Sequence, residues 1–299
     1  MSSVLYDAPG PRARVRNRVL GAVTVVVVLV LLGITVWRLA ATGQFDAQKW
    51  AIFTYTRPWL LLLEGLAATL GAFVVAAVGA LALGFILAVG RLSDHAWVRV
   101  PVGWIVEILR AIPVLIFMML LYYGLPVAGI SMDPYWAVVI ALIAYNGSVL
   151  AEALRAGVES LPRGQKEAGY AIGLRKNAVM RLILMPQAVR AMMPVIISQL
   201  VVALKDTALG FIITYPELLH YIQLLGNQVP FGSPLVPTAI VGGSIYVALC
   251  LILSYVAYRV QRSTRRSPKV RAARGGDGDD TVTETEAIAV GRRRGGARR

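Results

Sequence analysis

The chain has 299 residues, of which 57% are hydrophobic and 15% are charged, and its mean hydropathy is +0.66. Ordinary soluble domains carry about 25% charged residues, so this composition excludes a water-soluble globular protein. The formal net charge is +14, and the Lys and Arg residues are concentrated in the two tails and in alternate loops. That placement is typical of a protein oriented in a membrane and argues against nucleic-acid binding.

Apolar runs of roughly 20 residues recur along the chain, and a helix of this length crosses about 30 Å of hydrocarbon. The sequence predicts six transmembrane helices, over residues 19–41, 65–90, 98–125, 135–154, 186–204 and 236–258. The first run could instead be the apolar core of a signal peptide. It ends in Trp37 and Arg38 and not in a small-residue cleavage site, so we favour a retained helix.

The distribution of Lys and Arg predicts the sidedness of the loops. Both tails and the loops after the second and fourth spans are basic, whereas residues 206–258 contain no Lys or Arg. An even number of spans with both termini cytoplasmic satisfies every loop. We therefore expect a cytoplasmic tail over 1–18, an extra N-terminal helix over 19–41, a core over 60–260 and a disordered cytoplasmic tail over 267–299. The arginines of that last tail could meet lipid headgroups, but a solvated tail is favoured.

The connection between the fourth and fifth spans is too long for a simple link. We call residues 160–186 the EAA segment, for a reason given below. Pro162 and Gly164 mark the start of a short helix, and Gly173 marks its end. Ala168, Ala171 and Ile172 form a small apolar stripe on it, and a second short helix is expected over 176–184. A helix resting on lipid headgroups would prefer large apolar residues, so the stripe favours a protein partner.

Several motifs resemble one family. Glu167-Ala168-Gly169, then Gly173, then Ile183-Leu184-Met185-Pro186 resembles the EAA loop of ABC importer permeases, with Gly169 and Met185 as the departures. Residues 109–113, 152–164 and 204–209 resemble further motifs of the polar-amino-acid branch. The N-terminal residues 5–12 and the extra first span resemble the actinobacterial glutamate permeases.

This resemblance implies a fold, a function and partners. The implied fold is all-helical and polytopic, a five-helix permease core with one additional N-terminal helix and a cytoplasmic coupling helix. The implied function is ATP-driven import of a polar amino acid, glutamate above others, across the plasma membrane. The implied partners are a cytoplasmic ATPase dimer, a second permease subunit (identical or related) and an extracytoplasmic binding protein. The residues implied to couple to the ATPase are Glu167, Ala168, Gly169, Gly173, Ile183 and Pro186.

The residues themselves indicate a transport subunit and not an enzyme. A P-loop requires Gly-x-x-x-x-Gly-Lys-Ser/Thr, and its nearest approach, Gly164 to Gly169, is followed by Tyr170. We therefore expect no cofactor in this chain, with ATP and Mg²⁺ bound by the partner ATPase. No metal site is expected either, because the two histidines, His95 and His220, belong to opposite faces of the membrane and Cys250 is the single cysteine.

Charged residues within or at the ends of spans are costly and are candidates for the transport path. They are Arg110, Glu152, Lys205 and Asp206. Arg110 could bind a substrate carboxylate or form a structural ion pair with Glu107 one turn earlier. Glu152 could pair with Arg155 instead of lining the path, and Lys205 with Asp206. Asn146 and Gln199 are expected to join two helices by hydrogen bonds.

Two questions stay open at this point. An ion-gradient-driven secondary amino-acid transporter is the alternative function, although it would not need the EAA segment and usually shows two related halves. Residues 211–226 are apolar but too interrupted for a span, so a short helix that dips into the outer leaflet is expected there.

Overall fold

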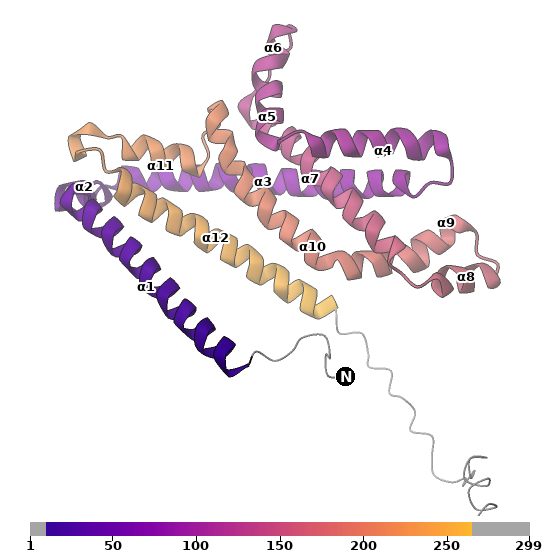
Figure 1. The fold of residues 1–299 in the computed structure, drawn as a ribbon. Coiled ribbons are helices and arrows are strands. Elements are labelled where there is room, and N and C mark those ends of the chain that lie inside the picture. Colours follow the sequence, from indigo (N-terminus) through magenta and orange to yellow (C-terminus); the bar gives the residue numbers. More distant parts are fainter. Residues whose placement is uncertain (1–9, 265–299) are drawn as a thin grey trace, which may run out of the picture. The chain divides into compact units, whose positions relative to one another are not determined.

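The computed structural model describes residues 10–264, and over this range it is helical with no strand (Figure 1). Five helices are long and apolar enough to cross a bilayer, and a bent pair raises the number to six. The long helices are α1 (Pro11–Ala41), α3 (Thr56–Arg91), α7 (Pro134–Glu159), α10 (Met185–Asp206) and α12 (Leu235–Thr264). The predicted all-helical polytopic fold is thus confirmed, whereas the tail at 267–299 lies outside the described residues.

The shorter elements connect these helices. Before α7 they are α2 (Ala47–Trp50), η1 (Ala51–Thr54), α4 (Ala96–Ala111), α5 (Val114–Met119), η2 (Leu120–Gly124) and α6 (Leu125–Val127). After α7 they are α8 (Arg163–Ala171), α9 (Lys176–Val179), η3 (Met180–Leu184), η4 (Thr207–Ile213), α11 (Leu218–Gly226) and η5 (Val229–Phe231). The nine-residue α11 is the short helix expected near residues 211–226.

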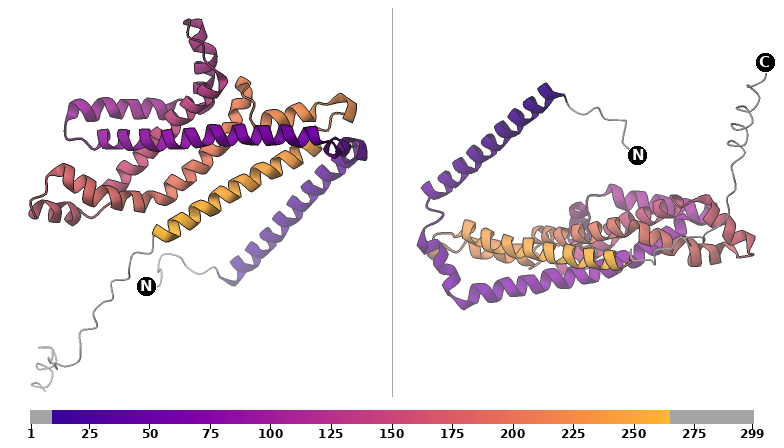
Figure 2. Two further views of the ribbon diagram at one scale, coloured as in Figure 1. Left: turned by 180° about the vertical axis from the view of Figure 1, so that it is seen from behind. Right: turned by 90° about the horizontal axis from the view of Figure 1, so that it is seen from below.

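The predicted third span is not one straight helix. It is broken between α4 and the α5–α6 segment, which are bent by 96° (Figures 1 and 2). Ile112 is extended, with φ −83° and ψ 121°, and Pro113 precedes the first residue of α5. Proline has no N–H to continue the helical ladder and disfavours helical backbone at the residue before it. The break therefore follows from Ile112-Pro113.

The centre of the fold is the packing of α3 against α7. Along α3, small residues at every fourth position are buried: Ala72, Ala76, Ala80, Gly84 and Ala88. A Cβ at Gly84 would lie 2.8 Å from Leu150 Cβ and 3.0 Å from the carbonyl oxygen of Gly147. The two backbones thus approach closely along this stripe, as they do where small residues mediate contact between membrane helices.

Helix α10 packs against α7 and also contacts α3. The buried Asn146 of α7 accepts a hydrogen bond from Gln199 Nε2 at 2.7 Å and donates to the carbonyl oxygen of Leu142 at 2.9 Å. The expected role of this pair as a link between helices is confirmed. Pro194 lies inside α10 without ending it, and the fifth apolar segment extends over Lys176–Ile213.

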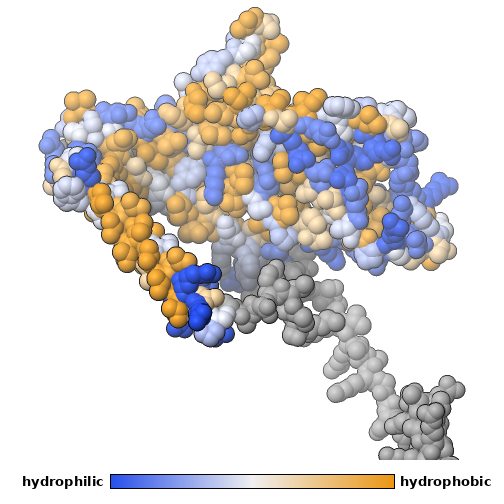
Figure 3. All heavy atoms as spheres, in the orientation of Figure 1, coloured by the Kyte–Doolittle hydropathy of each residue, from blue (hydrophilic) through white to orange (hydrophobic). Residues whose placement is uncertain are grey.

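The terminal helices are the least buried. Helix α12 contacts α3 and α10 through Leu249, Cys250 and Leu253, which pack near Phe73 and Leu204. None of the residues of α1 is buried, and its Val- and Leu-rich surface is visible as a hydrophobic rod (Figure 3). Lipid is the only solvent that suits such a helix.

Candidate functional site

The EAA segment begins with a well-defined short helix. Pro162 occupies the position before α8, and the helix ends in a Schellman motif at Gly173. The N–H of Gly173 donates to the carbonyl oxygen of Tyr170 at 2.9 Å, and that of Leu174 donates to Gly169 at 3.1 Å. Gly173 has φ +81°, a left-handed conformation that glycine adopts without a Cβ clash. The predicted helix end at Gly173 is confirmed.

Gly169 faces the chain itself. It is buried, and a Cβ there would lie 2.8 Å from Val179 Cγ2 and 3.0 Å from Ile183 Cδ1. Glycine in place of the family's second alanine lets α8 lie directly on α9 and η3. The resemblance implies that Gly169 takes part in coupling to the ATPase, and within the described chain its Cβ position faces α9 and η3.

The apolar stripe of α8 remains uncovered. Ala168 and Ala171 are exposed, and Ile172 is 75% exposed. Glu167 and Pro186 are also exposed, whereas Ile183 is half-buried beneath Gly169. Below α8, a small core of Val158, Val179, Leu184, Met185 and Ala188 holds the segment on the ends of α7 and α10. A rigidly held helix thus presents small apolar side chains outward.

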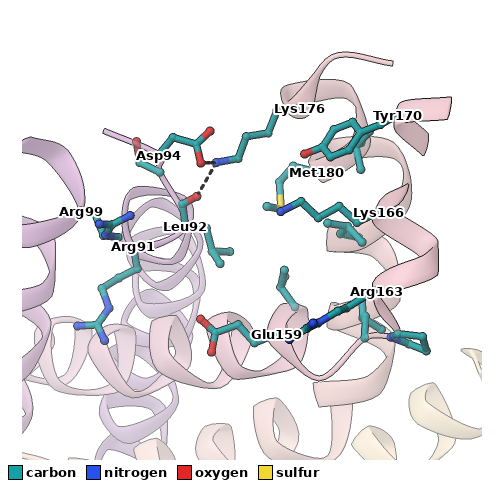
Figure 4. A pocket seen from close by; sticks show the side chains of 16 residues that line it. Arg91, Leu92, Asp94, Arg99, Glu159, Arg163, Lys166, Tyr170, Lys176 and Met180 are labelled. Atoms are coloured by element: carbon teal, nitrogen blue, oxygen red, sulfur yellow. Dashed lines mark hydrogen bonds and ion pairs between the residues drawn. The ribbon is translucent and has the colours of Figure 1, made fainter. Parts of the chain in front are cut away.

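A polar contact ties the EAA segment to the turn between α3 and α4. Lys176 Nζ forms an ion pair with Asp94 and donates to the carbonyl oxygen of Leu92 at 3.3 Å (Figure 4). The hydrogen bond from Lys176 lowers the pKa of the Asp94 carboxyl, so this carboxyl is ionised at neutral pH. Sequence reasoning missed this pair, because residues 94 and 176 are far apart in the chain and only the fold brings them together.

Glu152 lies in a cluster of charges that joins three helices. Its carboxylate accepts from Arg155 Nη2 at 2.6 Å and from Arg91 Nη2 at 3.2 Å. Arg91 also donates to the carbonyl oxygen of Gly103 at 3.3 Å and pairs with Glu107 at 3.8 Å, and Arg155 pairs with Glu159 at 2.5 Å. The Glu152–Arg155 pair that the sequence offered as the structural alternative is present. Glu152 therefore joins α3, α4 and α7.

Arg110 forms no ion pair with that cluster, although its charge acts on Glu152. It is exposed in the last turn of α4, directly before the break at Pro113, and not at the middle of a straight span. The alternative ion pair of Arg110 with Glu107 is absent from the described contacts, and Glu107 pairs with Arg91 instead. Within residues 10–264, Arg110 has no carboxylate within 4.0 Å. Its guanidinium is thus available at a bend of the backbone.

The structure does not gather the four path candidates at one place. Lys205 is exposed and Asp206 is half-buried at the end of α10, and the described contacts include no ion pair between them. Beyond them, Gly210 packs against Val138 of α7, fourteen residues before Glu152. At 1.5 Å per residue this places the end of α10 about 20 Å from Glu152. Within residues 10–264, Arg110 and Asp206 form no ion pair with each other, whereas Glu152 pairs with Arg91 and Arg155.

A buried carboxylate that the sequence did not single out holds α11. Glu217 is fully buried and caps the helix, accepting from Leu219 N at 2.9 Å and His220 N at 2.8 Å. Next to it, Thr69 Oγ1 of α3 accepts from Leu218 N at 3.1 Å. An N-cap carboxylate satisfies helix N–H groups that have no other partner. Among residues 10–264, no three His, Cys, Asp or Glu side chains gather as around a metal ion.

A comparison with known families matches a large part of the chain. Residues 80–266 match the family described as the inner membrane component of binding-protein-dependent transport systems. The chain belongs to this family. The resemblance noted in the sequence is thereby confirmed, and the protein is a transport component of the permease type.

Individual members of the family are also similar. The glutamate transport system permease protein GluD of Corynebacterium glutamicum is 40% identical over 232 residues, which are 76% of this chain and 84% of that protein. The arginine transport system permease protein ArtQ of Bacillus subtilis is 32% identical over 71% of this chain and 97% of its own length. A solved amino acid ABC transporter superposes with a TM-score of 0.64 at 24% identity, covering 71% of this chain and 98% of that chain, and so supports the fold.

Proposed function

We propose that this permease is the transmembrane subunit of an ATP-driven importer for a polar amino acid, with glutamate as the favoured substrate. The similarity to a glutamate permease at 40% identity over most of both chains supports the substrate. The exposed stripe of α8, held on buried Gly169 and ended by Gly173, supports docking of a separate ATPase. This stripe is the observation that carries the proposal.

The complex would contain two permease subunits, two ATPase subunits and an extracytoplasmic binding protein. The turn between α3 and α4 lies beside the EAA segment, as the Asp94–Lys176 pair shows, so both belong to one side of the membrane. With the basic loops inward, that side is the cytoplasm, and both termini lie there. ATP and Mg²⁺ would be bound by the ATPase.

Force from the ATPase would reach the helices along two contacts. Gly169 transmits movement of α8 to η3 and hence to α10, and Lys176 transmits it to the start of α4. At its other end α4 carries Arg110 and the break at Pro113. Arg110 would bind a substrate carboxylate there, with Lys205 and Asp206 further along the path, because a guanidinium matches a carboxylate in planar geometry.

The docking surface can be tested by cross-linking. A cysteine at Ala168 in a Cys250→Ala background is expected to cross-link to the partner ATPase, because Ala168 is exposed on the stripe. A cysteine at Ile130, which is 54% exposed between α6 and α7, is the matched control and should not cross-link. Equal cross-linking from both positions, or none from Ala168, would contradict the assignment.

The substrate can be tested by competition. Uptake of labelled glutamate is measured in cells with and without this chain, in the presence of excess unlabelled amino acids. Unlabelled glutamate is expected to abolish the chain-dependent uptake, and arginine is expected to leave it unchanged. If arginine or glutamine competes as strongly as glutamate, the substrate assignment is wrong while the transport function stands.

A further inference from the structure

A basic cavity lies between the α3–α4 turn and the EAA segment. Its volume is about 320 Å³, and Figure 4 shows its walls: Arg91, Asp94 and Arg99 on one side, Arg163, Lys166 and Lys176 on the other. Five cationic side chains and two carboxylates, Asp94 and Glu159, contribute to the lining.

Three of the cations are not neutralised within the described part of the chain. Arg91 pairs with Glu152 and Glu107, and Lys176 pairs with Asp94. Arg99, Arg163 and Lys166 have no carboxylate within 4.0 Å, and Lys166 lies 5.9 Å from the centre of the Tyr170 ring. The cavity therefore holds an excess of positive charge that an anionic group would balance.

Six apolar side chains also line the cavity, and we call them its apolar floor: Leu92, Val158, Leu161, Val179, Met180 and Leu184. Its walls are the ends of membrane helices, since Arg91 directly follows the apolar run of α3. Nearby on α4, Trp97 is 77% exposed and Trp104 is 65% exposed. Trp is enriched where helices meet the headgroup layer, so the cavity lies at that depth.

We infer that this cavity binds the phosphate headgroup of an anionic phospholipid. Basic pockets beside the cytoplasmic ends of membrane helices suit such headgroups, and an apolar floor suits the adjoining glycerol and acyl carbons. An acidic side chain of a protein partner would satisfy the cations but leave that floor unfilled. A bound lipid would bridge α4 and α8.

The lipid and the ATPase would use different faces of α8. Arg163, Lys166 and Tyr170 follow one face of the helix, whereas Ala168, Ala171 and Ile172 lie on the opposite face, at 3.6 residues per turn. The inference thus stands on the cavity and does not depend on the proposed coupling. Its test can fail while ATPase docking succeeds.

The test measures retention of phosphatidylglycerol by the purified full chain, using native mass spectrometry after exposure to mixed phosphatidylcholine and phosphatidylglycerol. The wild type is expected to retain phosphatidylglycerol selectively. Each of the substitutions Arg99→Gln, Arg163→Gln and Lys166→Gln should weaken retention by about fivefold, as expected for one cation near a lipid surface. Arg175→Gln, Arg181→Gln and Arg190→Gln remove exposed cations outside the cavity and should leave retention unchanged.

Three outcomes would overturn the inference. Equal retention of both lipids would show that no anionic headgroup is selected. Equal losses in the cavity and control variants would show a general charge effect. Displacement of the lipid by inorganic phosphate at similar concentration would assign the cavity to free phosphate instead of a headgroup.

Discussion

A leucine at Gly84 is expected to destabilise the permease more than any other single substitution considered for this fold. The added side chain would start 2.8 Å from Leu150 Cβ and 3.0 Å from a backbone oxygen of α7. Neither can move without separating α3 from α7, so the cost is expected at the upper end of the range of about 1–3 kcal/mol that is typical of overpacking. The folded fraction in detergent, followed by fluorescence-detected size exclusion during heating, should fall sharply.

Gly71 provides the matched control on the same helix. A Cβ at Gly71 meets nothing within 4 Å, and its surroundings are open. Gly71→Leu should therefore melt close to the wild type. If Gly84→Leu and Gly71→Leu behave alike, the close approach of α3 and α7 is not the contact that holds the fold.

Valine at Gly173 is expected to uncouple the permease from its ATPase while leaving membrane insertion intact. With φ at +81°, a β-branched side chain is strained by about 1–2 kcal/mol, and the Schellman motif that ends α8 would be lost. Without that end, α8 no longer presents its stripe in one orientation. Co-purification of the ATPase with the tagged permease should fall about tenfold, because a loss of roughly 1.4 kcal/mol of binding free energy lowers an association constant tenfold.

Asparagine at the same position separates strain from side-chain size. Asn adopts left-handed backbone far more readily than valine and is found at this position of helix ends. Gly173→Asn should therefore retain most of the ATPase. Normal co-purification by Gly173→Val would count against α8 as the docking element.

Much of the fold followed from hydropathy and charge, because lipid imposes long apolar helices that are visible in the chain. The C-terminal end of α3 and the start of α12 lie within one residue of their expected positions, and Gly173 alone predicted the end of α8. The sequence also contains the cause of the break, because Pro113 disfavours helical backbone at Ile112. The apolar run continues through these residues, and the length of that run predicted a single span.

The contacts between helices were harder to foresee. The small residues from Ala72 to Ala88 recur at every fourth position, a spacing that indicates one close-packed helix face. In contrast, Asp94 with Lys176 and Arg91 with Glu152 join residues distant in sequence. No local pattern marks them. The inward position of Gly169 likewise depends on where α9 and η3 return.

Reconstituted uptake tests the central claim most directly, that this chain transports a polar amino acid only when a partner ATPase drives it. Proteoliposomes would contain the chain with its ATPase and, if required, the second permease subunit, with the binding protein outside and labelled glutamate as substrate. Uptake is predicted to require internal ATP and to disappear when the ATPase is omitted, whatever ion gradient is imposed. Uptake by the chain alone, driven by a Na⁺ or proton gradient, would contradict the account and establish a secondary transporter.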